Sequence, residues 1–243
     1  MLWSADHDTG DLSQWYEGDG GGEFNSGSAT STASDDVARS GRFSAKATIV
    51  TPHVPETSGV RLFRWTESHF HQEACYGAWL YFPQQYIVPL WWNILQFKSR
   101  SGSTLNDVFW SLQVGNRPRG PMFVYLNWWE GLSIEGPHQD EFGGRSYSQT
   151  VKDIPVRRWT HLQVYLRQSS TFEGQIIVWQ DDVELFNMNG VRTRYPSGNG
   201  ANEWSVNNYS DILSPSPTTI YIDDAAITTA SVEPSSAGAS GAR

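Results

Sequence analysis

Two paired strands are indicated by the run Arg157-Arg158-Trp159-Thr160-His161-Leu162-Gln163-Val164-Tyr165-Leu166-Arg167, followed by Gly174-Gln175-Ile176-Ile177-Val178-Trp179-Gln180-Asp181-Asp182. Side chains alternate between the two faces of a strand. One face of the first strand therefore carries Thr160, Leu162, Val164 and Leu166. The other face carries His161, Gln163, Tyr165 and Arg167. A row of long polar groups with an aromatic ring suits a sheet that holds a sugar chain, so carbohydrate is the leading substrate class.

The composition fits a single all-β domain rich in aromatic residues. The chain has 243 residues, of which 14% are aromatic, including 12 Trp. This is enough aromatic surface to fill a core between two sheets and still line a groove. The formal net charge of -9 disfavours nucleic acid as a partner, although a local basic cleft can still bind an acidic glycan. Cys75 is the only cysteine, which excludes a disulfide framework and a thiolate metal cluster.

The sequence contains no stretch of about 20 apolar residues, so we expect no membrane partner. Met1 leads directly into Trp3 and Asp6, with no signal peptide visible, which leaves secretion open. We expect an extracellular protein with a carbohydrate partner and no organic cofactor. The oligomeric state is not indicated by any pattern in the sequence.

Short segments rich in aromatic or β-branched residues recur along the chain, each bounded by Gly, Pro, Asn or Asp. The predicted strands are 42–50, 60–66, 75–82, 91–98, 108–114, 122–128, 160–167, 175–180, 183–186 and 218–227. No amphipathic run predicts a helix. This pattern predicts a single antiparallel β-sandwich of the jelly-roll type over residues 1–229. Residues 230–243, rich in Ser, Gly and Ala, are predicted to form a flexible tail.

Several predicted strands have one mixed face of amides, aromatic rings and charges. In the strand around Gln96, we expect Lys98 on the same face as Gln96, with Asn93, Leu95 and Phe97 on the other. We expect the mixed faces to join into one groove on the concave sheet, formed by Gln96, Lys98, Gln113, Tyr125, Asn127, His161, Gln163, Tyr165 and Arg167. Aromatic rings stack on sugar C–H faces, while amides and guanidinium groups bind hydroxyls and carboxylates. The alternative is a merely solvated sheet face, but such faces prefer Lys, Glu and Thr.

The pattern Trp159-x-His161-x-x-Val164, followed by Gly174-x-Ile176-x-Val178-x-x-Asp181-Asp182, resembles the concanavalin-like and laminin-G-like jelly rolls. The segments 9–15, 40–45 and 219–227 resemble the start and the final strand of the heparin lyase I-like and glucuronan lyase-like polysaccharide lyases. The resemblance extends over most of the chain. Its motifs are largely structural, so it implies the fold more strongly than the activity.

A lyase of this kind cleaves a uronic-acid polymer by β-elimination. One group neutralises the substrate carboxylate, a base removes the C5 proton, and an acid protonates the departing oxygen. The resemblance implies Gln96 for the first role, His69 or His71 as the base, and Tyr209 as the late tyrosine. It implies Arg61 and Lys98 as groups that steady the substrate charge. The chain departs from the family in two ways: Lys98 stands where a His is common, and no Lys or Arg neighbours Tyr209.

Two other functions use the same predicted surface. A non-catalytic, lectin-like carbohydrate-binding module would use Trp92, Tyr125, Trp129 and Tyr165 as stacking platforms. A structural or assembly jelly roll would bind no glycan. A glycosidase ranks lower, because no pair of carboxylates lies centrally on the expected face. An esterase ranks lowest, because the sequence has no Gly-x-Ser-x-Gly elbow.

A structural calcium site is predicted where the chain begins and ends. Asp6, Asp8 and Asp11 lie near the start, and Asp223 and Asp224 near the end. The first and last strands of a jelly roll are commonly neighbours, and hard carboxylate oxygens suit Ca²⁺. We therefore predict Asp11, Asp223 and Asp224 as its ligands, with ordinary loop capping as the alternative. The pair His69 and His71 lacks a further ligand at clear spacing, so no transition metal is expected.

Overall fold

A computed structural model of the chain describes residues 1–18, 20–51, 56–64, 72–101, 105–129, 145–195 and 202–229. This part of the chain forms fifteen strands and a short 3₁₀ helix, η1 (Ser13–Tyr16). The strands are β1 (Trp3–Ala5), β2 (Gly21–Ser26), β3 (Ala29–Ser34), β4 (Ser44–Ile49), β5 (Ser58–Arg64), β6 (Glu73–Tyr81), β7 (Trp92–Ser101), β8 (Leu105–Asn116), β9 (Met122–Trp128), β10 (Arg145–Ser148), β11 (Trp159–Arg167), β12 (Gly174–Gln180), β13 (Val183–Val191), β14 (Asn202–Ser210) and β15 (Thr218–Thr229).

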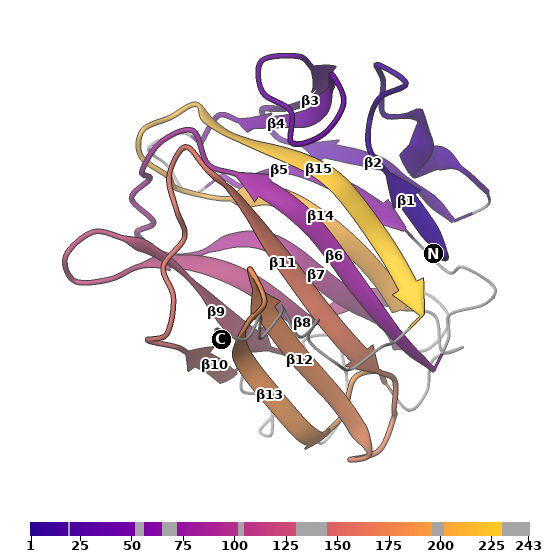
Figure 1. Ribbon diagram of the computed structural model, residues 1–243. Coiled ribbons are helices and arrows are strands. Elements are labelled where there is room, and N and C mark those ends of the chain that lie inside the picture. Colours follow the sequence, from indigo (N-terminus) through magenta and orange to yellow (C-terminus); the bar gives the residue numbers. More distant parts are fainter. Residues whose placement is uncertain are drawn as a thin grey trace, which may run out of the picture.

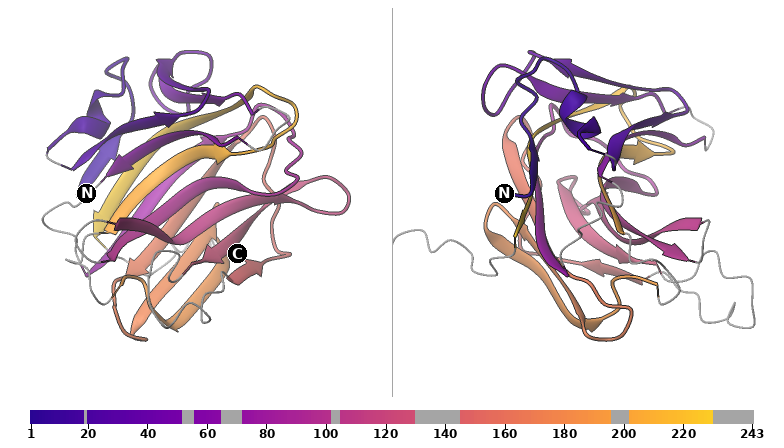
Figure 2. Two further views of the ribbon diagram at one scale, coloured as in Figure 1. Left: turned by 180° about the vertical axis from the view of Figure 1, so that it is seen from behind. Right: turned by 90° about the vertical axis from the view of Figure 1, so that its right-hand side faces the viewer.

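The strands pair into two sheets that pack face to face (Figures 1 and 2). The eight-stranded sheet has the order β13-β12-β11-β6-β15-β4-β3, and β1 pairs with β15. The seven-stranded sheet has the order β10-β9-β8-β7-β14-β5-β2. The strand pairings within both sheets are antiparallel. The predicted antiparallel β-sandwich of the jelly-roll type is therefore confirmed.

The predicted alternation of β11 is confirmed in detail. Leu162, Val164 and Leu166 are at most 1% exposed and belong to the core between the sheets. Large aromatic side chains fill the rest of this core, among them Trp15, Tyr76, Phe97, Trp110 and Trp204. Burying one large apolar side chain stabilises the fold by roughly 1.5–3 kcal/mol, so this aromatic layer is a major contribution to the stability of the sandwich.

Every predicted strand overlaps an observed one, but the sequence did not predict β1, β2, β3, β10 or β14. The omission of β14 matters most, because β14 lies between β7 and β5 at the centre of the seven-stranded sheet. Asn is depleted in strands, and three of the nine residues of β14 are Asn. Its strand signal is the alternation of Trp204 and Val206, both of which point into the core.

A β-bulge in β7 places Asn93 on the opposite face of the strand from the one predicted. The register between β7 and β8 shifts between Asn93 and Leu95. The extra residue places Asn93 on the face that carries Gln96, and Asn93 Nδ2 donates a hydrogen bond to Gln96 Oε1 (3.0 Å). The prediction that Asn93 shares a face with Leu95 and Phe97 was wrong, because simple alternation does not anticipate a bulge.

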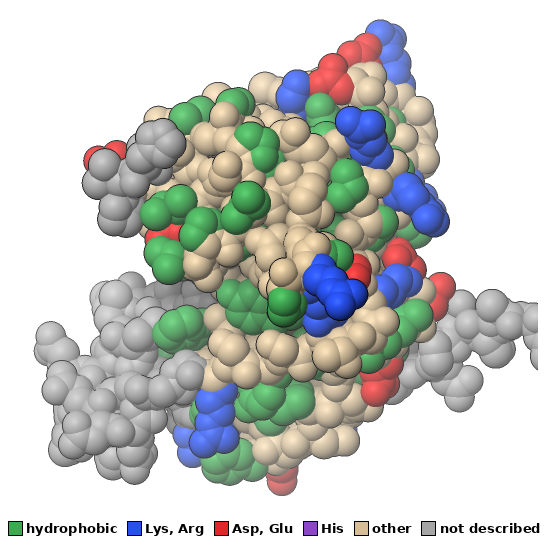
Figure 3. All heavy atoms as spheres, turned by 90° about the vertical axis from the view of Figure 1, so that its left-hand side faces the viewer, with side chains coloured by type: hydrophobic (Ala, Val, Ile, Leu, Met, Phe, Trp, Pro, Cys, Tyr) green, Lys and Arg blue, Asp and Glu red, His purple; other side chains and the backbone are tan. Residues whose placement is uncertain are grey.

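Charged and apolar side chains are mixed on the surface. On the edge of the sandwich that Figure 3 shows, Lys and Arg side chains are spread among neutral and hydrophobic ones. None of the helices in the described residues is long and apolar enough to span a membrane. The predicted tail at residues 230–243 lies outside the described residues.

Candidate functional site

A row of short polar side chains crosses the seven-stranded sheet on the face turned away from the core. Cross-strand pairing places Asn127 of β9 beside Ser111 of β8, Ser111 beside Gln96 of β7, and Gln96 beside Ser205 of β14. These four side chains are at most 7% exposed. The row lies at the middle of the sheet, where the strands hold each residue in a fixed position.

Hydrogen bonds connect this row to a second one. Asn207 Nδ2 donates to Asn93 Oδ1 (2.7 Å), and Asn93 in turn donates to Gln96. Gln113 Nε2 donates to Ser111 Oγ (3.0 Å). Asn93 was expected on the other face of β7, and the sequence did not predict Ser111, Ser205 or Asn207 as site residues. The last two can be read from the alternation of β14, whereas the bulge concealed Asn93.

Several polar atoms of this face are buried without a hydrogen-bond partner in the described residues. They are Gln96 Nε2, Gln113 Oε1, Ser205 Oγ, Asn207 Oδ1 and Arg61 Nε. Buried polar atoms in native proteins are nearly always paired, so each exception needs an explanation. Donors and acceptors that remain open on one face are explained if a polar ligand completes them.

Tyr209 lies beside this network and is held on several sides. Its ring stacks edge-to-face on Trp91 at a centroid distance of 4.8 Å, and the guanidinium carbon of Arg61 lies 4.2 Å from its centroid. Residue 59 pairs with Tyr209 across the strands, and a Cβ there would lie 3.0 Å from Tyr209 Cγ. The glycine therefore allows the ring to lie close against β5. The geometry brings the predicted residues Gln96, Arg61 and Tyr209 onto one face.

The remaining residues predicted on this sheet extend the same face. Lys98 follows Gln96 by two positions on β7 and is half-buried, and Trp129 directly follows β9. Tyr125 pairs with Gln113, and burial raises the pKa of the Tyr125 phenol, so this group stays protonated at neutral pH. Asn127 accepts a hydrogen bond from Ser146 (2.6 Å).

The prediction that His161, Gln163, Tyr165 and Arg167 join this face was wrong. They lie on β11, which pairs with β6 and β12 in the eight-stranded sheet. Their side chains point away from the core on the opposite side of the sandwich. Alternation predicts which side chains of a strand share a face, but it does not predict which sheet the strand joins.

On that opposite face these residues pack among other aromatic groups. His161 stacks on Trp79 with ring centroids 4.7 Å apart, and the guanidinium carbon of Arg39 lies 3.9 Å from the Trp79 ring. Burial lowers the pKa of His161, which favours its neutral form. Tyr165 packs with Ile177 in a small apolar cluster separate from the main core.

Two of the predicted stacking platforms are also corrected. Trp92 is 0% exposed and points into the core, where its Nε1 donates to Asn208 Oδ1 (2.9 Å). Tyr165 is 2% exposed and belongs to the other sheet. Tyr125 and Trp129 remain beside the polar rows. The predicted bases His69 and His71 lie outside the described residues.

The predicted calcium ligands do not come together. Asp11 is exposed and accepts hydrogen bonds from Thr9 and Ser13, close to its own position in the chain. Within the described ranges, no group of three or more His, Cys, Asp or Glu residues is arranged to hold a metal ion. The predicted meeting of the first and last strands is nevertheless correct, since β1 pairs with β15. The site drawn from Asp11, Asp223 and Asp224 was therefore wrong in its geometry.

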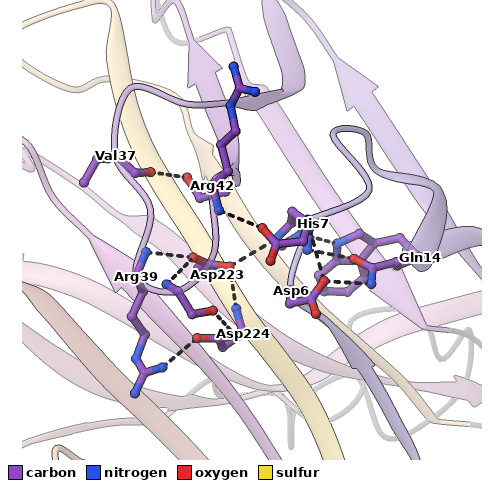
Figure 4. A network of polar contacts seen from close by, with 12 residues as sticks. Asp6, His7, Gln14, Val37, Arg39, Arg42, Asp223 and Asp224 are labelled. Carbon is purple, nitrogen blue, oxygen red and sulfur yellow. Dashed lines mark hydrogen bonds and ion pairs between the residues drawn. The ribbon is translucent and has the colours of Figure 1, made fainter.

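Protein donors surround the two aspartates of β15 instead (Figure 4). Asp223 is 0% exposed, accepts a hydrogen bond from the backbone N–H of Arg39 (2.8 Å), and has His7 Nδ1 at 3.5 Å. Asp224 forms an ion pair with the Arg39 guanidinium at 2.7 Å and accepts from the Ser40 hydroxyl. The carboxylates join the segments around His7 and Arg39 to the last strand.

Comparisons with known proteins agree with this architecture. A family model for polysaccharide lyases matches residues 7–226. No curated protein sequence matches the chain. Among solved structures, the endo-β-1,4-glucuronan lyase of the fungus Trichoderma reesei is 14% identical and gives a TM-score of 0.67 over 85% of this chain and 90% of its own.

Two alginate lyases have the same fold. The enzyme of Aplysia kurodai is 12% identical, with a TM-score of 0.59 over 94% of this chain and 99% of its own. The enzyme of a Chlorella virus is 11% identical, with a TM-score of 0.57 over 85% of this chain and 92% of its own. At such identities the likeness in structure establishes the fold alone. The family model, which extends over most of the sequence, establishes more: the chain belongs to the polysaccharide lyase family.

Proposed function

We propose that this protein cleaves a uronic-acid-containing glycan by β-elimination on the outward face of the seven-stranded sheet. The observation that carries the proposal is the set of open amide, hydroxyl and guanidinium groups around Gln96. A sugar carboxylate needs hydrogen-bond donors, and the neighbouring hydroxyls need both donors and acceptors. This face offers both kinds of group in fixed positions.

The chemistry assigns a distinct role to each group. In the reaction the C5 proton leaves, its electron pair forms the C4–C5 double bond, and the C4–O4 bond breaks with proton transfer to the departing oxygen. Gln96 Nε2 donates to the substrate carboxylate and stabilises the charge that develops when C5 loses its proton. Tyr209 is the proton-transferring phenol, and Arg61 and Lys98 bind the flanking carboxylates. His69 or His71 stays the predicted base.

The proposed substrate class is supported by the relatives as well as by the site. The three similar solved structures described above are, by their names, lyases of glucuronan and of alginate. Both names denote acidic polysaccharides. An acidic polymer outside the cell requires an exported enzyme, so an extracellular location is part of the proposal.

The test is an incubation with glucuronan, alginate, heparin-type, pectic and hyaluronan polymers, each with and without Ca²⁺. The readout is the ultraviolet absorbance of the unsaturated uronate. We expect one polymer to give a rising signal. Gln96→Ala should lower the rate by roughly 10²–10³-fold, and Tyr209→Phe by roughly 10²–10⁴-fold. Gln163→Ala, an outward polar residue of the other sheet, is the matched control and should keep the wild-type rate.

Three outcomes would contradict the proposal. A flat trace for folded protein on every polymer, together with loss of glycan affinity in Trp129→Ala, would identify a binding module instead. Wild-type rates in both Gln96→Ala and Tyr209→Phe would place the reaction elsewhere in the molecule. A protein that binds no glycan and elutes as a large species would be an assembly domain.

A further inference from the structure

A cavity of about 560 Å³ opens at one end of the eight-stranded sheet. It lies where β6 begins, where β11 runs into β12, and where β13 ends. The residues that line it are Gln72, Arg167, Gln168, Ser169, Phe172, Glu173, Asn189 and Gly190. Its lining includes no residue of the seven-stranded sheet, so the cavity is separate from the face around Gln96.

An exposed aromatic ring stands at this cavity. Phe172 is 63% exposed in the turn between β11 and β12. The guanidinium carbon of Arg192 lies 4.6 Å from the centroid of the ring, which fixes the ring by a cation–π contact. A large apolar side chain left in solvent but held in place is a stacking surface for the C–H face of a sugar.

The polar groups of the cavity are fixed in position. Arg167 Nε donates to the backbone oxygen of Glu173 (2.9 Å), and its Nη2 donates to Asn189 Oδ1 (3.3 Å). The backbone N–H of Gln168 donates to the backbone oxygen of Gln72 (2.8 Å). These bonds tie the ends of β6, β11 and β13 into one rigid wall.

One buried donor of this wall is unused. Gln168 is 9% exposed, and its Nε2 has no hydrogen-bond partner among the residues that the structure describes. An unpaired buried amide destabilises the fold, and a ligand hydroxyl that accepts its hydrogen bond can remove that cost. Gln168 thus points independently to a polar ligand at the place where Phe172 offers an apolar surface.

The polar groups that line the cavity indicate which kind of ligand it can bind. The lining combines carboxamides, the Arg167 guanidinium and the Glu173 carboxylate, so donors and acceptors are both present and the charges balance. A ligand that offers only acceptors, such as a phosphate, would leave the Glu173 carboxylate without a donor. Sugar hydroxyls pair with donors and acceptors alike. We propose that this cavity is a second saccharide-binding site, which takes a sugar unit through its hydroxyls while Phe172 stacks on the ring.

Two sources can supply such a sugar unit. One is a distant part of the same polysaccharide that the outward face of the other sheet cleaves, and this source rests on the proposed function. The other is a neutral glycan next to the substrate in its natural material. Both present the same hydroxyl chemistry, so the experiment must separate them.

The experiment measures calorimetric binding of tetrasaccharides of β-1,4-glucuronate, of mannuronate and of β-1,4-glucose to the full chain. The variants are Phe172→Ala and Gln168→Ala. Ile87→Ala is the matched control, because Ile87 is an equally exposed apolar residue at 61% and does not line the cavity. We expect Phe172→Ala to weaken the binding of one tetrasaccharide about tenfold, as the loss of one ring contact predicts. Gln168→Ala should weaken the same binding, and Ile87→Ala should not.

The outcomes also separate this proposal from the lyase reaction. If the unit belongs to the substrate, wild type shows two binding steps and Phe172→Ala one, with unchanged turnover of the tetrasaccharide. If it belongs to a neutral glycan, the glucose tetrasaccharide binds in a Phe172-dependent manner without turnover. The proposal is overturned if folded Phe172→Ala and Gln168→Ala bind all three probes as wild type does. An inactive wild type would refute the lyase reaction while leaving this binding result readable.

Discussion

The ring of Tyr209 can occupy its position because residue 59 is a glycine and has no side chain. Glycine at that position lets the ring lie against β5, between Trp91 and Arg61. The substitution Gly59→Ala would place a methyl group within contact distance of the ring, and the ring must move. A displacement of about 1 Å at a proton-transferring group can cost about 100-fold in rate. We therefore expect Gly59→Ala to lower kcat about 10- to 100-fold on the polymer that wild type cleaves.

The control for this variant is Gly77→Ala on the other sheet. A Cβ at residue 77 would lie 3.0 Å from His161 Nε2, so this position is also crowded, although less than residue 59, whose nearest neighbour is Tyr209 Cδ2. Residue 77 is far from Tyr209 in the fold. Circular dichroism should show both variants folded. Equal losses of kcat in the two variants would mean that crowding in a strand, rather than the position of Tyr209, reduces the rate.

His161 should make the stability of the protein depend on pH. Burial against Trp79 lowers its pKa below the ordinary 6.5, so the unfolded chain binds a proton more readily than the folded one. The free energy of unfolding therefore decreases as the pH falls through 6.5 towards the folded pKa. We expect His161→Gln, which is neutral throughout, to reduce the drop in thermal midpoint between pH 7 and pH 5. An unchanged drop would show that other groups cause it.

At the scale of elements, a local sequence pattern predicts the two faces of a strand but not which strands become its neighbours. The faces of β9 and β11 follow alternation, and the structure agrees with both. The pairing of β11 with β6 depends on contacts between segments far apart in the chain, which a local pattern does not contain. The bulge at Asn93 depends in the same way on its neighbours β8 and β14. The sequence therefore predicted several polar residues that lie on the outward face of the seven-stranded sheet, but it did not predict Asn93, Ser205 or Asn207 on this face, nor which strands form it.

Asn208 is the residue of β14 that ties this strand to others. It is 0% exposed, accepts the Trp92 Nε1 hydrogen, and donates from Nδ2 to the backbone oxygens of Ala47 and Thr218, both at 3.0 Å. It thereby joins the two sheets through β7, β4 and β15. Asn208→Ala leaves these buried partners unpaired, each at a cost of about 1–3 kcal/mol. We expect a loss of roughly 3 kcal/mol in the free energy of unfolding, measured in urea.

The matched control is Asn25→Ala, because Asn25 is exposed and, among the residues that the structure describes, its side chain bonds to the side chains of Glu23 and Ser31. It should change the free energy of unfolding by less than about 0.5 kcal/mol. A comparably small loss in Asn208→Ala would mean that water replaces the amide at this position.

At the scale of the whole molecule, the first and last strands of the chain lie side by side. β1 pairs with β15, and the Arg39 guanidinium supplies a positive charge to Asp224, while the backbone N–H groups of Arg39 and Ser40 supply donors to Asp223. Asp223 and Asp224 are two of the three carboxylates predicted for calcium, and the protein's own groups already bind them. We expect a chelator to leave the thermal midpoint unchanged. We expect Arg39→Gln to lower the midpoint by about 2–4 °C, because it removes the partner of Asp224.

Arg42→Gln controls for the loss of an arginine from the same segment. The ion pair of Arg42 with Asp35 is 3.4 Å long between side chains that are 74% and 59% exposed, and exposed pairs of this kind contribute little. Its midpoint should match that of wild type. A midpoint that falls with chelator and recovers with added Ca²⁺ would show that the contact between the first and last strands depends on a cation after all. If chelator lowers the midpoint of Arg39→Gln and Ca²⁺ restores it, while wild type responds to neither, then the Arg39 guanidinium occupies the place of a cation in the native protein.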